Sequence, residues 1–202
     1  MKDKFLMIDS LPTLWLVIPC YNEEDVLPIT APMFKETVAG LMDSDLVGQA
    51  SKILFVNDGS SDKTWEIIQE FAREPIFEGV SLSRNRGHQN ALLAGLMECR
   101  GKCDISVSID CDGQDDISKI HDMVLKYNDG FDVVYGVRSS RDTDTMFKRL
   151  TAEGFYKVLN SMGVEAVFNH ADYRLMSARA LDGLAQFNEV NLFLRGMVPL
   201  VG

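Results

Sequence analysis

The sequence lacks a hydrophobic run long enough to cross a membrane. A membrane-spanning helix needs roughly 18 or more apolar residues in succession, and none occurs among the 202 residues. The N-terminal segment is partly apolar, but Asp9 and Pro12 interrupt it, so a strand over Leu14–Pro19 is a better prediction than a signal peptide. The chain by itself is therefore expected to be soluble.

Several other signatures are scarce or missing. The four cysteines show neither the C-x-x-C spacing of zinc and redox sites nor a secretory context, so they are predicted to be free thiols in a reducing cytoplasm. Neither G-x-G-x-x-G nor a P-loop occurs, which argues against a dinucleotide site and an NTPase. The net charge of −10 argues against a general nucleic-acid binder.

The amino-acid composition fits one α/β domain. Hydrophobic residues make up 46% of the chain and charged residues 25%, which is ordinary for a globular protein. A chain of this length buries about 70% of its unfolded surface without disulfides or metals as supports. No internal repeat, low-complexity tract or flexible linker divides it, so a single domain over residues 1–202 is predicted.

Apolar runs alternate with amphipathic stretches along most of the chain. The predicted strands cover residues 14–19, 52–57, 79–83, 105–109, 132–137 and 171–176. Helices are predicted between them, with Pro28 and Pro32 as candidate breaks in the first, and over 145–162 and 178–187. A β-α spacing of about 25 to 30 residues up to the fifth strand predicts a mostly parallel sheet with helices on both faces.

The fourth predicted strand ends in a cluster of acids. Ile105, Val107 and Ile109 alternate with small hydroxyl residues, which is the period of a strand, and Asp110 and Asp112 follow directly. Ligands of open parallel sheets bind at the carboxyl ends of the strands. Asp110 and Asp112 are therefore predicted to belong to a binding site.

Oxygen ligands in this cluster indicate a hard divalent cation. D-x-D occurs three times in the chain, but only the pair at 110/112 follows an apolar strand. An EF-hand would need Gly and Glu where Asp115 and His121 stand. Asp110, Asp112 and Gln114 suit Mg²⁺ or Mn²⁺ with substrate phosphates completing the shell. The alternative is an acidic turn that only caps a helix.

Polar clusters also follow the first two strands, at residues 21–23 and 57–60. Three such clusters on one edge are hard to explain by capping alone, and a nucleotide could lie across them with Asp58 accepting a hydrogen bond from a base or ribose. Cationic side chains in the segments that follow strands could bind a diphosphate at this edge. The alternative is that they are ordinary solvated surface charges. These cations are Arg84, Arg86, Arg138, Arg141, Lys148 and Arg149.

Taken together, these motifs resemble the family-2 glycosyltransferases, which have the Rossmann-like α/β fold called GT-A. The matching segments are Leu16–Glu24, Val56–Asp62, Leu82–Gln89, Asp110–Gln114, Val134–Arg138 and Asp172–Met176. The likeness is strongest to the polyprenyl-phosphate transferases of the family, the bactoprenol glucosyltransferases and dolichyl-phosphate mannose synthases. It implies a nucleotide-sugar donor, a polyprenyl-phosphate acceptor and a place at the cytoplasmic face of the cell membrane.

The resemblance also implies roles for individual residues. Those expected to hold the nucleotide-sugar are Pro19, Tyr21, Glu23, Asp58, Arg84, Asp110, Cys111 and Asp112, with Asp110, Asp112 and Gln114 as metal ligands. Arg138 is expected to bind the diphosphate or the acceptor phosphate, and Arg149 and Arg174 are further candidates for phosphate binding. Cys111 and Asp116 stand where the family motif commonly has a small residue and a proline, which affects loop shape more than metal binding.

Asp172 is the candidate base or aligner of the acceptor, with a structural partnership to Arg174 as the alternative. A phosphate monoester is already largely dianionic at pH 7, so it needs orientation more than deprotonation, whereas a sugar hydroxyl would need a true base. An inverting, metal-dependent hexose transfer, with UDP-glucose as the model donor, is the function implied. The alternatives are transfer to a saccharide hydroxyl in surface polysaccharide synthesis and a non-catalytic nucleotide-sugar-binding module.

The resemblance extends to the organisation of the chain. Residues 14–138 would form the nucleotide-sugar half and 139–202 an elaboration on the acceptor side. Relatives continue into membrane helices, and Leu192–Gly196 resembles their juxtamembrane segment, so membrane contact is expected in a longer natural protein. The sequence leaves the oligomeric state open, a homo-oligomer included.

Overall fold

The computed structural model describes residues 11–137, 170–187 and 194–201. Its strands are β1 Leu14–Cys20, β2 Lys52–Asn57, β3 Phe77–Ser81, β4 Ile105–Ser108, β5 Val133–Val137 and β6 His170–Ser177. Its helices are α1 Leu27–Asp43, α2 Thr64–Phe71, α3 His88–Cys99, α4 Lys119–Asn128, α6 Ala178–Leu184 and α7 Leu194–Met197, followed by the 3₁₀ turn η1 Val198–Leu200.

These strands form one sheet in the order β3-β2-β1-β4-β6-β5. β1 pairs in parallel with β2 and β4, and β2 pairs in parallel with β3. β6 runs antiparallel to both of its neighbours, β4 and β5. The predicted mostly parallel α/β sheet is confirmed. The antiparallel direction of β6 brings its first residues to the edge where β1, β2 and β4 end.

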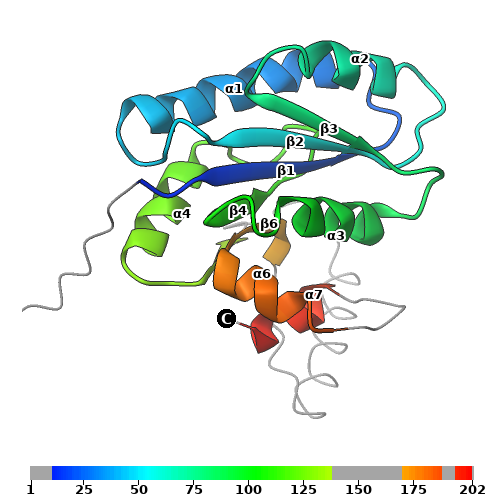
Figure 1. Cartoon of the computed structure of the whole chain (residues 1–202). Helices are drawn as coiled ribbons and strands as arrows, with labels where there is room; N and C mark the ends of the chain where they lie inside the picture. Colours follow the sequence, from blue (N-terminus) through cyan, green and yellow to red (C-terminus); the bar gives the residue numbers. More distant parts are fainter. Residues whose placement is uncertain (1–10, 138–169, 188–193, 202) are drawn as a thin grey trace, which may run out of the picture.

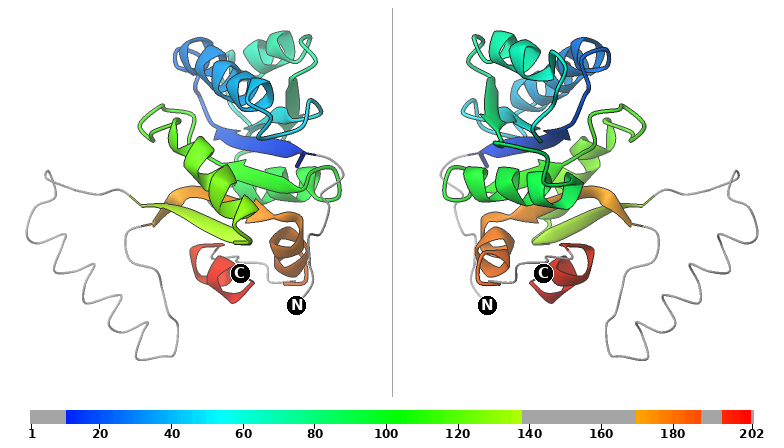
Figure 2. Two further views of the ribbon diagram at one scale, coloured as in Figure 1. Left: turned by 90° about the vertical axis from the view of Figure 1, so that its left-hand side faces the viewer. Right: turned by 90° about the vertical axis from the view of Figure 1, so that its right-hand side faces the viewer.

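Helices cover both faces of this sheet (Figure 1). Leu14, Leu16 and Ile18 of β1 pack in the core that includes α1, α2 and α4. Trp15 and Val17 point to the opposite core, where α3, α6 and α7 pack. The side views in Figure 2 show the C-terminal helices, in orange and red, on the side of the sheet away from α1 and α2. Burial on both faces explains why β1 is a continuous apolar run.

The structure differs from the sequence-based expectations at α1 and β3. α1 runs unbroken through Pro32; Pro28 lies in its first turn, where no N–H is needed. β3 begins two residues earlier than predicted, at Phe77, which pairs with Ile53 of β2. The predicted helix over 145–162 lies outside the described residues. Among the residues described, no helix has the length and apolar character that crossing a bilayer requires.

Helix α3 lies unusually close to the sheet at Gly95. A Cβ at this position would lie 2.5 Å from Cγ1 of Val17 and 2.7 Å from Cγ2 of Val56. The small residues of this helix predict such close packing, and the structure agrees. The contact brings α3 close to β1 and β2.

The change Gly95→Ala should therefore destabilise the protein by about 1–3 kcal/mol, because the added methyl group overpacks the interface with β1 and β2. Gly40→Ala in α1 is the matched control, since nothing lies within 4 Å of its Cβ position. That change should stabilise the helix by about 0.5–1 kcal/mol. Urea unfolding followed by circular dichroism measures both, and equal effects would contradict the packing argument.

Candidate functional site

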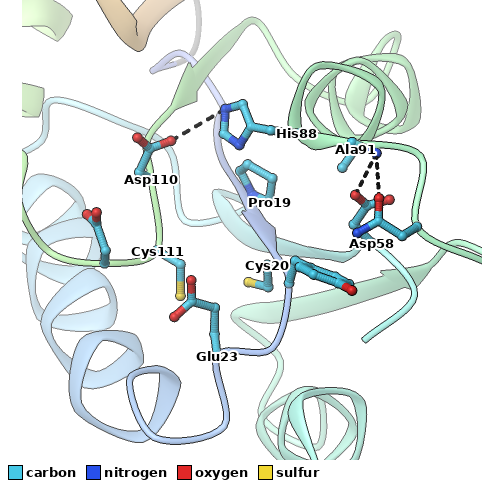
Figure 3. A pocket seen from close by; sticks show the side chains of 12 residues that line it. Pro19, Cys20, Glu23, Asp58, His88, Ala91, Asp110 and Cys111 are labelled. Atoms are coloured by element: carbon cyan, nitrogen blue, oxygen red, sulfur yellow. Dashed lines mark hydrogen bonds and ion pairs between the residues drawn. The ribbon is translucent and has the colours of Figure 1, made fainter. Parts of the chain in front are cut away.

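A cavity of about 300 Å³ lies at the carboxyl edge of the sheet (Figure 3). It brings together most of the residues predicted to hold a nucleotide-sugar, from segments up to 93 positions apart. Its lining consists of Pro19, Cys20, Tyr21, Glu23, Asp58, Asn85, Gly87, His88, Ala91, Asp110, Cys111 and Asp112. The predicted convergence of the three strand ends is therefore found in the structure.

The loop after β1 is fastened to the loop after β2. The backbone N–H of Asn22 donates to Oγ of Ser60 at 3.0 Å, and that of Glu23 donates to Oγ1 of Thr64 at 2.8 Å. In return, the side-chain oxygen of Asn22 accepts from the N–H of Ser61 at 2.9 Å. These bonds fix the places of Glu23 and of Tyr21, whose ring is 47% exposed at the cavity mouth.

Asp58 fixes the loop before α3. Its carboxylate is only 2% exposed and accepts the backbone N–H groups of Arg86 at 2.7 Å and Gly87 at 2.9 Å. Hydrogen bonds to an ionised acceptor are about twice as strong as neutral ones. Gly59 has φ +66°, and a Cβ there would lie 2.4 Å from the carbonyl carbon of Arg84. Asp58 thus lines the cavity, while Arg84 lies exposed on the loop outside the lining.

The acidic loop after β4 is a tight turn. Gly113 adopts φ +70°, and Oδ1 of Asp112 accepts the backbone N–H of Gln114 at 3.0 Å. Asp110 and Asp112 line the cavity. Gln114 lines a neighbouring cavity of about 510 Å³ beside α4 and β5.

Negative charge accumulates around these acids. Burial raises the pKa of Asp110; the nearby His88 opposes that rise, while the carboxylates of Asp115, Asp112 and Asp172 add to it. The pKa of Glu23 is also raised, first by burial and then by Asp112, Asp62 and Asp110. A cation at this edge would offset the mutual repulsion of these carboxylates.

The acids fit a divalent cation that also binds a substrate. Oδ1 of Asp110 is buried and accepts no hydrogen bond within the part of the chain that the structure describes; Nε2 of His88 lies 3.6 Å from it. Among the same residues, no three His, Cys, Asp or Glu side chains form a complete metal cage. Mg²⁺ commonly takes only one or two carboxylates from the protein and completes its shell with phosphates and water.

Cys111 separates the two acids and points inward. Its Sγ lies 3.8 Å from Oγ1 of Thr30 in α1, and its thiol adjoins that of Cys20 in the cavity wall (Figure 3). Burial, followed by the neighbouring thiol of Cys111, raises the pKa of Cys20 well above its ordinary value, so Cys20 is a neutral thiol here. All four cysteines are free and buried, which confirms the prediction of free thiols.

Asp172 reaches the cavity edge from the first residues of β6. Ser108 pairs with Arg174 across β4 and β6, and this register extended by two residues places Asp110 opposite Asp172. Oδ1 of Asp172 accepts from Arg174 at 2.8 Å, and Oδ2 accepts from Nε2 of Gln89 at 2.9 Å. Nε2 of His88 lies 3.2 Å from the same Oδ2.

Arg174, one of the predicted phosphate ligands, does not line the cavity. Arg174 has no exposed surface and its guanidinium binds Asp172, a placement that does not fit the predicted contact with a phosphate. Arg138 and Arg149 lie outside the described residues. From the sequence, His88 at the start of a predicted helix would contact a phosphate or cap that helix, and Gln89 has no predicted role. The available signal was their position at the start of a helix that follows a strand at this edge.

Sequence comparison agrees with the mostly parallel α/β fold and the cavity at its strand ends. The profile described as "Glycosyl transferase family 2" matches residues 15–184. The chain belongs to this family, as its motifs indicated.

Two relatives show how similar the chain is to individual proteins. The chain is 50% identical over 197 residues to "Uncharacterized glycosyltransferase YkoT" of Bacillus subtilis (strain 168), covering 97% of this chain and 58% of the relative. It is 38% identical over 189 residues to "Bactoprenol glucosyl transferase" of Shigella phage SfV, covering 93% of this chain and 59% of the relative. The chain thus spans a little under three fifths of the length of these relatives.

A solved structure supports the fold. Glucosyl-3-phosphoglycerate synthase from Mycobacterium tuberculosis, in complex with Mn²⁺, UDP and phosphoglyceric acid, superposes with a TM-score of 0.57 and 19% identity. The match covers 85% of this chain and 58% of that one.

The buried ion pair of Asp172 and Arg174 leads to a prediction about stability. Asp172→Ala would leave the fully buried guanidinium of Arg174 without this carboxylate, and breaking a buried ion pair costs about 3–5 kcal/mol. Glu74→Gln removes an exposed partner of Lys35 and should cost about 0–1 kcal/mol. Thermal and urea unfolding measure both changes. A loss at Asp172 no larger than that at Glu74 would show that the buried pair is not held as described.

Proposed function

We propose that this chain is the donor-binding, catalytic part of a glycosyltransferase that moves a hexose from a nucleotide-sugar to polyprenyl phosphate with Mg²⁺ or Mn²⁺. The observation that carries the proposal is the single cavity that joins Tyr21, Glu23 and Asp58 to Asp110 and Asp112. It offers an exposed aromatic ring and hydrogen-bond acceptors at one end and clustered carboxylates at the other. These are the groups that a nucleoside and a cation-bound diphosphate require.

The residues of the chain would divide the work along the cavity. Tyr21 and Asp58 would bind the nucleoside, Asp58 through the lone pairs that its two backbone donors leave available. Asp110 and Asp112 would hold the divalent cation, which when bound stabilises the charge that builds up on the leaving diphosphate. The start of the twelve-residue helix α3 faces the same cavity, and a helix N-terminus favours anions.

Two observations favour a phosphate as the acceptor. One relative carries the name bactoprenol glucosyl transferase. In addition, Asp172 is only 4% exposed and its carboxylate binds groups of the protein, so it is poorly placed to take a proton from a sugar hydroxyl. A phosphate acceptor, already ionised near neutral pH, needs no such base. This acceptor would place the enzyme at the cytoplasmic face of the cell membrane.

A transfer assay with the natural-length protein tests the proposal. The enzyme is mixed with UDP-[¹⁴C]glucose and either polyprenyl phosphate or an oligosaccharide, with Mn²⁺ or with EDTA. Label that enters the lipid only with Mn²⁺ supports the proposal. Label that enters the oligosaccharide instead would assign a hydroxyl acceptor, and bound donor without transfer to either would assign a binding module.

The acidic pair provides the sharpest variant in this assay. Asp110→Asn and Asp112→Asn should each lower the transfer rate by about 10²–10³-fold, because they weaken the charge stabilisation of the leaving diphosphate. The matched control is the double variant Asp43→Asn, Asp45→Asn, which changes an exposed D-x-D pair at the end of α1. It should leave the rate unchanged. Equal losses in the two pairs would remove the assigned role from Asp110 and Asp112.

A further inference from the structure

Asp172 is a buried carboxylate whose oxygens face the protein. Only 4% of the residue is exposed. Oδ1 lies 2.8 Å from Arg174, and Oδ2 lies 2.9 Å from Gln89 and 3.2 Å from His88. A general base must come within about 2.6–3.2 Å of the proton-bearing atom of the substrate. At Asp172, these positions are held by protein nitrogen atoms.

The groups that Asp172 contacts form a connection from the core to the cavity. Arg174 is fully buried in β6, and Gln89 is partly buried in the first turn of α3. His88, the first residue of α3, lines the cavity and is 43% exposed in its side chain. Figure 3 shows its ring turned toward Asp110, with Nε2 of His88 3.6 Å from Oδ1 of that acid.

The N-terminal turn of α3 depends on this connection. Gly87, just before the helix, has φ +85° and supplies no side-chain cap. Asp58 holds the backbone N–H of Gly87 on one side. Asp172 holds the side chains of Gln89 and His88 on the other. Two buried carboxylates from different strands thus fix the position of one imidazole.

We infer that Asp172 is a positioning residue that holds His88 against the cavity wall, and that the imidazole of His88 is the group of this cluster that contacts the diphosphate of the donor. The inference rests on the proposed function, since it needs a diphosphate beside Asp110. It removes Asp172 from direct contact with the acceptor. Arg174 and Gln89 act with Asp172, one from the core and one from the helix.

A double-mutant cycle between Asp172→Asn and His88→Ala tests the inference. Each single change should weaken UDP binding in the presence of Mn²⁺ and lower the transfer rate, each by roughly tenfold, as expected for a contact or its supporting residue. In the His88→Ala background, Asp172→Asn should then cost less than about twofold, because the group that it positions is gone. If Asp172 acts directly on the acceptor, Asp172→Asn should lower the transfer rate by the same factor with and without His88→Ala. That result would overturn the inference.

Steady-state constants separate the two roles independently. Loss of positioning raises KM for the nucleotide-sugar and leaves KM for polyprenyl phosphate unchanged. Loss of a base or acceptor aligner lowers kcat or raises KM for the acceptor and leaves UDP binding intact. The second pattern in Asp172→Asn would contradict the inference.

Gln89→Leu keeps the test valid if Asp172→Asn fails to fold. It removes one contact of Asp172 while the buried pair with Arg174 stays, so the melting temperature should fall by only about 2–6 °C while UDP affinity falls roughly threefold. The matched control is Gln69→Leu, the same change at an exposed position of α2, and His121→Ala is the control for His88→Ala. Both controls should bind UDP normally. Unchanged UDP affinity in Gln89→Leu would count against the positioning role.

Two results distinguish the proposed function from the positioning role of Asp172. If wild-type protein binds no UDP with Mn²⁺, the proposed function itself is wrong. If wild type binds UDP and the costs at Asp172 and His88 are independent, the function stands and the positioning inference is wrong.

Discussion

The shared direction of β1, β2 and β4 is the constraint on which the site depends. Because these strands run in parallel and lie side by side, their carboxyl ends meet at one edge, and each ends in a polar segment. The apolar runs that bury the strands on both faces fix this arrangement, since the core packs against both sides of β1. The cavity is therefore a consequence of sheet topology rather than of any one loop.

The antiparallel strand β6 adds a second layer to the site. Its first residues arrive at the same edge from the opposite direction, so Asp172 lies across from Asp110 where two like charges would repel. Arg174, Gln89 and His88 supply cationic or hydrogen-bonding groups around Asp172 that compensate this repulsion. The same contacts connect the buried core of β6 to the start of α3. The buried arginine and the cavity wall are thus parts of one network.

Periodicity and strand-end chemistry could predict the sheet, its helices and most of the cavity. The alternation before Asp110 and the motif around Asp58 each depend on nearby residues, which is why a single sequence reveals them. The direction of β6 depends on pairing with β4, a long-range choice that no local pattern encodes. For the same reason Arg174 resembled a phosphate ligand in the sequence, although the structure buries it. Gln89 and His88 were undervalued because their partner lies more than 80 positions away in the chain.

Calorimetric titration of this chain with UDP and GDP, each with Mn²⁺ and with EDTA, tests the central claim most directly. The claim is that the cavity at the carboxyl edge binds the nucleoside diphosphate of a sugar donor through a cation held by Asp110 and Asp112. The account predicts that UDP binds only when Mn²⁺ is present, and a preference for GDP would indicate a mannosyl-type donor at the same site. Absence of binding by both nucleotides in the presence of Mn²⁺ would contradict it.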